Sequence, residues 1–161
     1  AKVLLYGYVT QGNLENVTAS KKKGVVEEHL NDVTIILYED GKEIKTTKNR
    51  RTGFYSVVLE SGKNYQLAFQ RDGFISKRVS VEASEIPEKN YDEAFKMFTD
   101  ITLFPEMEGK DFTKYSKRII AKCVYNKSKD RMAWDMDYAR EVWGLFLEMS
   151  GAMSGQALLE E

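Results

Sequence analysis

The stretch that decides the fold is residues 31–81, NDVTIILYEDGKEIKTTKNRRTGFYSVVLESGKNYQLAFQRDGFISKRVSV. Apolar and polar side chains alternate along it, so that alternate residues from Val33 to Leu37 share one face. Asp40-Gly41 follows and favours a type I′ hairpin turn, because both central positions of that turn need a positive φ. Further turn signals recur at roughly ten-residue spacing, at Thr52-Gly53, Ser61-Gly62 and Asp72-Gly73. The stretch therefore predicts a β-meander within an all-β sandwich or barrel.

Strand patterns also lie on both sides of this stretch. Residues 2–10 alternate like a first strand, and Gly7 inside it indicates a bulge or a close approach of another backbone. Residues 91–105 carry apolar side chains at alternate positions and predict one long final strand of the sandwich. Residues 118–125 form another β-type run, with residues 131–134 as its hairpin partner.

A C-terminal helix is predicted to follow this hairpin. Asp135 or Asp137 stands where an N-cap is needed, before an apolar run. Apolar residues then recur at helical spacing, at Tyr138, Val142, Leu145, Phe146 and Met149. Trp143 and Leu147 lie off this stripe and give the helix a second apolar face, which either packs on the chain's own sheets or docks on a partner. The residues predicted to bind a partner are Trp143, Phe146, Leu147 and Met153.

Composition and charge exclude several classes of protein. The chain has 161 residues, which suits one domain or one domain with an appended element. Its net charge of −1 gives no overall field that would attract nucleic acid or an anionic membrane, and no run is long and apolar enough to span a bilayer. Cys123 is the only cysteine, so it forms no intrachain disulfide and is expected to be a buried thiol. The start at Ala1 fits a chain whose export signal has been removed, and it fits an arbitrary start nearly as well.

Residues that carry chemistry are few and scattered. His29 is the only histidine, and it has neither further ligands at zinc spacing nor a nucleophile motif around it. The carboxylates show neither a distinct acid–base pair nor an EF-hand loop. Basic runs at residues 21–23 and 48–51 are interpreted as solvated loop tips, with contact to an anion or a lipid headgroup as the alternative for the first. The sequence therefore predicts no catalytic residue, no metal and no cofactor, and thus a protein that is not an enzyme.

Several short motifs follow one another in order along the first two-thirds of the chain. They are Gly7-Tyr8-Val9, Val33-Thr34-Ile35, Gly53-Phe54-Tyr55, Gly62-Lys63-Asn64-Tyr65 and Arg71-Asp72-Gly73-Phe74. As a set they resemble the carboxypeptidase regulatory-like domain, which has a transthyretin-like β-sandwich. The resemblance implies a mainly β fold, with a transthyretin-like antiparallel β-sandwich over residues 1–105. A C-terminal extension over residues 106–161 would carry a short hairpin and one α-helix, and it is similar to envelope proteins of Gram-negative bacteria.

The resemblance and the exclusions lead to one functional hypothesis and one alternative. Domains of this family occur as adhesive or structural modules, so we expect a non-enzymatic structural or interaction module of a bacterial cell envelope. It would lie in the periplasm or at the outer membrane, as an accessory subunit that docks on a larger assembly through the C-terminal helix. The alternative is a carbohydrate- or peptidoglycan-binding domain that stacks sugars on exposed aromatic side chains. Its candidate residues, if their strand faces are open, are Tyr6, Tyr8, Tyr38 and Tyr55. Packing in the core or across strands is the favoured interpretation for each of them.

Overall fold

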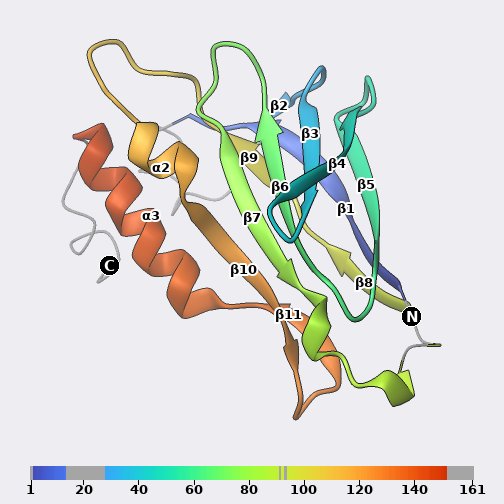
Figure 1. The fold of residues 1–161 in the computed structure, drawn as a ribbon. Helices are drawn as coiled ribbons and strands as arrows, with labels where there is room; N and C mark the ends of the chain where they lie inside the picture. The colour runs from blue at the N-terminus through green and yellow to red at the C-terminus, as the bar shows by residue number, and fades with distance from the viewer. Residues whose placement is uncertain (1, 14–27, 91, 93, 152–161) are drawn as a thin grey trace.

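Two β-sheets, with helices along one side, form the fold in the computed structural model, which describes residues 2–13, 28–90, 92 and 94–151 (Figure 1). The first sheet contains β1 (Lys2–Gln11), β2 (Glu28–His29), β5 (Phe54–Glu60), β8 (Ala94–Phe98) and β9 (Ile101–Leu103). The second sheet has the strand order β11-β10-β7-β6-β3-β4. Its strands are β3 (Thr34–Glu39), β4 (Lys42–Lys48), β6 (Asn64–Gln70), β7 (Lys77–Glu82), β10 (Ile119–Asn126) and β11 (Arg131–Trp134). The helical elements are η1 (Ala83–Glu85), η2 (Glu88–Asn90), α2 (Thr113–Lys117) and α3 (Met136–Ser150).

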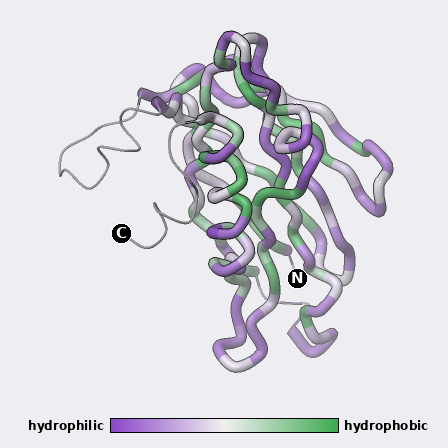
Figure 2. The backbone as a smooth tube through the Cα atoms, turned by 90° about the vertical axis from the view of Figure 1, so that its left-hand side faces the viewer, coloured by the Kyte–Doolittle hydropathy of each residue, from purple (hydrophilic) through white to green (hydrophobic). Residues whose placement is uncertain are grey.

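A shared hydrophobic core holds the two sheets together. Alternate residues of the strands point inward, and Val3 and Leu5 of β1 meet Leu67 and Val79 of the second sheet in this core. Hydrophobic and hydrophilic residues accordingly alternate along the chain trace (Figure 2). The burial of these inward rows stabilises the sandwich through the removal of apolar surface from water. The predicted mainly β sandwich is therefore confirmed.

The turn predicted at Asp40-Gly41 is confirmed. Residue Glu39 pairs with Lys42 across it, and Asp40 and Gly41 have φ values of 50° and 81°, as a type I′ turn requires. The predicted continuous meander is wrong, however, because the chain crosses between the sheets before and after β5. Strand β5 pairs with β1 in the first sheet, whereas β3, β4, β6 and β7 belong to the second.

The long strand predicted at residues 91–105 is in fact two strands, and both run parallel to β1. Strand β8 pairs with residues 2–6 of β1, and β9 pairs with residues 9–11. The break lies at Thr99, whose N–H donates to the carbonyl oxygen of Tyr6 over 2.8 Å. A Cβ atom at Gly7 would lie 2.1 Å from the carbonyl oxygen of Thr99. The glycine therefore permits the close backbone approach that the sequence indicated as one of two alternatives.

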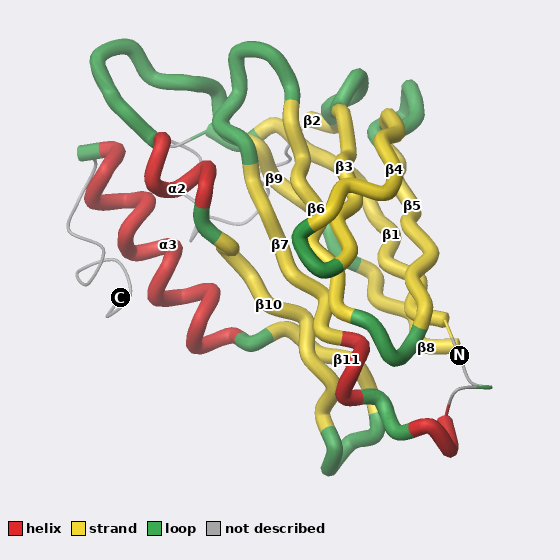
Figure 3. Tube along the Cα trace, in the orientation of Figure 1, coloured by secondary structure: helices red, strands yellow, loops and turns green. Residues whose placement is uncertain are grey.

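The residues after 105 continue the second sheet and add a second core. Strand β10 runs parallel to β7 and forms the predicted hairpin with β11. Helix α3 lies beside β10 at the edge of this sheet, together with α2 (Figure 3). The Asp135 carboxylate caps α3 by accepting from the N–H of Tyr138, which confirms one of the two predicted N-caps. The second core lies between these helices and the sheet, and its buried residues are Ile75, Phe104, Phe112, Tyr115, Val142, Phe146 and Leu147. The domain boundary at residue 105 stays a prediction.

Candidate functional site

The outer face of the first sheet carries aromatic and aliphatic side chains that other parts of the described chain leave exposed or half-buried. Because Val3 and Leu5 point into the core, the residues between and after them on β1 point outward. Pairing in register aligns Tyr8 with Phe54 and Tyr6 with Phe98. We call this surface the aromatic face, and it consists of Leu4, Tyr6, Tyr8, Phe54, Val58 and Phe98. Phe98 is 60% exposed and Val58 is 58% exposed, which is unusual for large apolar side chains grouped on one sheet face.

Ring contacts organise the aromatic face. The ring centroids of Tyr6 and Phe98 lie 5.4 Å apart in an edge-to-face arrangement. Tyr8 stacks on His29 at 4.3 Å and meets Phe54 edge-on at 5.6 Å. Such contacts between aromatic rings favour defined orientations, so the rings form an ordered surface.

Polar groups border this surface. The Asp100 carboxylate accepts from the backbone N–H of Tyr8 over 2.9 Å, and the Arg50 guanidinium lies 5.4 Å from the centre of the Phe54 ring. Ser56 is exposed opposite Tyr6 in the same cross-strand row. The site therefore combines exposed rings with hydrogen-bonding groups at its margin.

The four tyrosines that the sequence predicted as sugar-stacking residues do not lie together. Tyr6 and Tyr8 share the aromatic face, but Tyr38 lies on the outer face of the second sheet, against Arg78. Tyr55 is buried, and its hydroxyl group donates to the carbonyl oxygen of Thr99 over 2.7 Å. Burial also raises the pKa of Tyr55 above its usual value. Tyr55 is therefore excluded as a stacking residue and has the core packing that was the favoured interpretation, because its side chain lies between the sheets.

The residues predicted to bind a partner have different positions on α3. Phe146 and Leu147 are fully buried in the second core, whereas Trp143 is half-buried and stacks on Phe146 at 4.9 Å. Met153 lies outside the described residues. Phe146 and Leu147 thus pack inside the chain, and docking of the helix on a partner stays a prediction that concerns its remaining surface.

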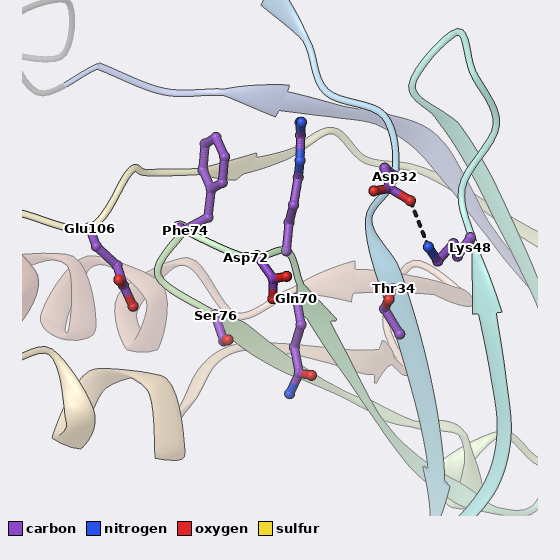
Figure 4. A pocket seen from close by; sticks show the side chains of 10 residues that line it. Asp32, Thr34, Lys48, Gln70, Asp72, Phe74, Ser76 and Glu106 are labelled. Carbon is purple, nitrogen blue, oxygen red and sulfur yellow. Dashed lines mark hydrogen bonds and ion pairs between the residues drawn. The ribbon is translucent and has the colours of Figure 1, made fainter.

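A polar hollow of about 570 Å³ opens on the outer face of the second sheet, at the ends of β3 and β4 (Figure 4). Its wall includes the cross-strand row Lys48, Thr34 and Gln70. The Lys48 ammonium lies 2.6 Å from the Asp32 carboxylate, and this hydrogen bond, followed by the attraction between the charges, lowers the pKa of Asp32. A carboxylate with a lowered pKa is a weak base. We therefore interpret the Asp32–Lys48 pair as part of the wall of the hollow and not as a group that transfers protons.

The described residues contain no group of three or more His, Cys, Asp or Glu side chains placed to hold a metal ion. The predicted buried position of Cys123 is confirmed, and burial raises the pKa of its thiol to about 12. The basic run at residues 21–23 lies outside the described residues. No helix in the described ranges is both long and apolar enough to cross a membrane.

No family model matches this chain, and no curated protein matches it. Among solved structures, it is similar to GBS52, the minor pilin in the gram-positive pathogen Streptococcus agalactiae. That match has 12% identity and a TM-score of 0.42, and it covers 69% of this chain and 48% of the pilin. A match to 3-chlorocatechol 1,2-dioxygenase from Rhodococcus opacus 1CP has 7% identity, a TM-score of 0.39 and coverage of 66% and 60%. A match to S.CueP has 15% identity, a TM-score of 0.36 and coverage of 64% and 62%.

These similarities concern the fold alone, and the chain spans between 48% and 62% of the length of the three proteins. The prediction that this chain is not an enzyme is corrected by the dioxygenase among the similar structures. Function depends on the site rather than on the fold.

Proposed function

We propose that this chain is a structural and interaction module of a bacterial cell envelope, and that it contacts its assembly through the aromatic face. The single observation that supports the contact surface is the exposure of Phe98 beside Tyr6 and of Val58 beside Leu4. Soluble proteins rarely expose grouped large apolar side chains unless these contact another molecule. Burial of such rings in an interface would give much of the binding energy.

The proposed location rests on the sequence. The ordered motifs along β1, β3 and β5 support a transthyretin-like sandwich of the carboxypeptidase regulatory-like type, whose members occur in envelope proteins. We propose that the chain acts in the periplasm or at the outer membrane as a subunit of a larger assembly. The C-terminal helix remains a second docking element in this proposal. Its exposed side, away from the second core, would contact the partner.

Substitution of the aromatic face tests the proposed contact. The double variant Phe98→Ser with Val58→Ser removes the two most exposed apolar side chains of this surface. Ile44→Ser is the control, because this residue is also a large exposed apolar side chain but lies on β4, outside both proposed contact surfaces. We expect the first variant to lose its complex in native envelope extracts, measured by co-purification and native mass, while the control keeps it. Equal retention by both variants contradicts the proposal.

A second candidate function is the binding of saccharides by the same face. The observation that favours it is the combination of the exposed Phe98 ring and Tyr6 with polar groups such as Ser56 and Asp100. Sugar rings stack their C–H faces on aromatic rings, while their hydroxyl groups bind polar neighbours. Sedimentation with peptidoglycan and insoluble polysaccharides tests this function. We expect Tyr6→Ser to reduce binding, and Tyr38→Ser, which alters the other sheet, to leave it unchanged.

A further inference from the structure

The outer face of the second sheet carries a row of hydrogen-bond donors that the proposed function does not use. Ser80 of β7 pairs in register with Gln66 of β6 and with Lys122 of β10. Arg78 precedes Ser80 by two residues on β7 and therefore points to the same side of the sheet. These strands run side by side in Figure 1. We call Gln66, Arg78, Ser80 and Lys122 the donor row.

The cations of this surface have no acidic partner. Within the described ranges, neither Arg78 nor Lys122 has a carboxylate within ion-pair distance. Arg78 instead lies 4.8 Å from the centre of the Tyr38 ring, and Lys122 lies 4.2 Å from that of Tyr138. A tyrosine face attracts a cation without neutralising its charge, so the positive charge stays available to an anion.

Two donors of the row are also unsatisfied. The hydroxyl oxygen of Ser80 and Nε of Arg78 are buried without a hydrogen-bond partner, and Ser80 as a whole is only 9% exposed. Arg78 uses Nη1 alone among its nitrogens for a described bond, to the amide oxygen of Gln66 over 3.3 Å. A buried donor without a partner destabilises the chain, which makes an external acceptor at this position favourable.

We propose that the donor row binds a phosphate group. The row offers two cations, a hydroxyl group and an amide, and the Gln66 oxygen is already used by Arg78. A tetrahedral oxyanion has enough acceptor oxygens for several of these donors at once, and the planar guanidinium binds two of its oxygens in parallel. Arg78 and Lys122 leave their tyrosine rings and turn toward Ser80 when the anion binds. The phosphate group is either free or esterified in an anionic lipid headgroup, because both present the same oxygens.

Titration with inorganic phosphate, followed by amide chemical shifts, tests the proposal. We expect saturable shifts at Gln66, Ser80 and Lys122. The affinity of Arg78→Gln with Lys122→Gln should be about a hundredfold weaker, since each of the two lost charge-assisted bonds is worth about tenfold. The matched control is Lys42→Gln with Lys45→Gln on the exposed edge strand β4, which changes the net charge equally. Vesicles with and without phosphatidylglycerol distinguish the two sources, and binding of either probe that depends on the donor row supports the proposal.

Ser80→Ala separates ligand binding from a purely structural role. Removal of an unsatisfied buried hydroxyl group is expected to raise the unfolding temperature of the free chain. The same variant is expected to weaken phosphate binding several-fold, because the anion loses a donor. The proposal is overturned if the unaltered chain binds neither probe, or if Ser80→Ala and the double variant bind phosphate as well as the β4 control does.

Discussion

The two outer faces of the sandwich differ in chemistry although the same strand alternation produces both. On the first sheet the outward side chains include the aromatic pair Tyr6 and Phe98 and the aliphatic Val58. On the second sheet they include polar and cationic groups, such as Gln66, Ser80 and Lys122. The inner faces are constrained by one shared core, whereas each outer face varies independently of the other. The comparison indicates that the outer faces, rather than the core, distinguish the functions of this fold.

The largest effect on stability is expected in the second core, where α3 packs beside the second sheet. Phe146 is fully buried, and its ring lies 4.9 Å from that of Tyr115 and 5.0 Å from that of Phe104. We expect Phe146→Ala to lower the free energy of unfolding by about 3–5 kcal/mol, since it leaves a cavity. Met136→Ala, at an exposed position of the same helix, is the control and should change it by less than about 0.5 kcal/mol. Urea denaturation measures both values, and similar losses would contradict the assigned second core.

The next largest effect is expected at the backbone contact beneath the aromatic face. Gly7→Ala places a Cβ atom against the carbonyl oxygen of Thr99, so β1 must shift relative to the start of β9. We expect the free energy of unfolding to fall by about 1–3 kcal/mol. Ser56→Ala, at an exposed position in an adjacent strand, should have almost no effect in the same measurement. A stable Gly7→Ala variant would show that the two backbones are farther apart than described.

A small effect on stability is expected on the aromatic face itself. Phe98→Ser removes a side chain that is mostly exposed, so the free energy of unfolding should change by about 0.5 kcal/mol or less. Phe95→Ser, three residues earlier on the buried side of β8, should cost several times as much. Thermal unfolding of the two variants compares the faces of one strand. Equal losses would indicate that Phe98 supports the fold and is not kept for contact.

The smallest effect is expected at the Asp32–Lys48 pair beside the polar hollow. The pKa of Asp32 is lowered in the folded chain, so its contribution to stability is complete above the ordinary pKa of an aspartate and is lost as the pH falls through the lowered value. We expect Asp32→Asn to remove this part of the acid dependence while stability at neutral pH changes little, because both side chains are exposed. Unfolding temperatures between neutral and acidic pH measure it. If the stability of the variant depended on acidic pH as that of the unaltered chain does, the interaction between Asp32 and Lys48 would be contradicted.

Local signals were sufficient to predict parts of this fold. Asp40-Gly41 specifies its turn by itself, because its backbone requirement is met within two residues. Asp135 likewise caps α3 through an N–H only three residues away. The alternation from Val33 to Leu37 identified the buried face of β3, since burial repeats every second residue.

Long-range pairings could not be predicted in the same way. The break at Thr99 depends on its contacts with Gly7 and Tyr55, which are distant in the sequence. Strand β5 has the same alternation whichever sheet it joins, so the sequence pattern does not reveal the crossing.

The candidate site was only partly visible for the same reason. Tyr6 and Tyr8 were identified as possible stacking residues, but the contribution of Phe98 depends on the parallel pairing of β1 with β8. Arg78 and Lys122 were not recognised because each is an ordinary charged residue until β7 and β10 bring them to one side. One signal in the sequence could have indicated the aromatic face. Leu4, Tyr6 and Tyr8 alternate with the core residues of β1, so its outward side is apolar as well.

The parallel pairing of β1 with β8 and β9 also has a consequence for biosynthesis. Lys2 pairs with Ala94 and Gln11 pairs with Leu103, so β1 is synthesised about ninety residues before these partners. Until then one edge of β1 offers unsatisfied backbone groups to neighbouring nascent chains. Such distant pairings slow folding and extend the period in which aggregation competes with it. A chaperone that protects this edge of β1 until β8 and β9 pair with it would therefore benefit this chain more than a chain in which the corresponding strand pairs with the next strand in sequence.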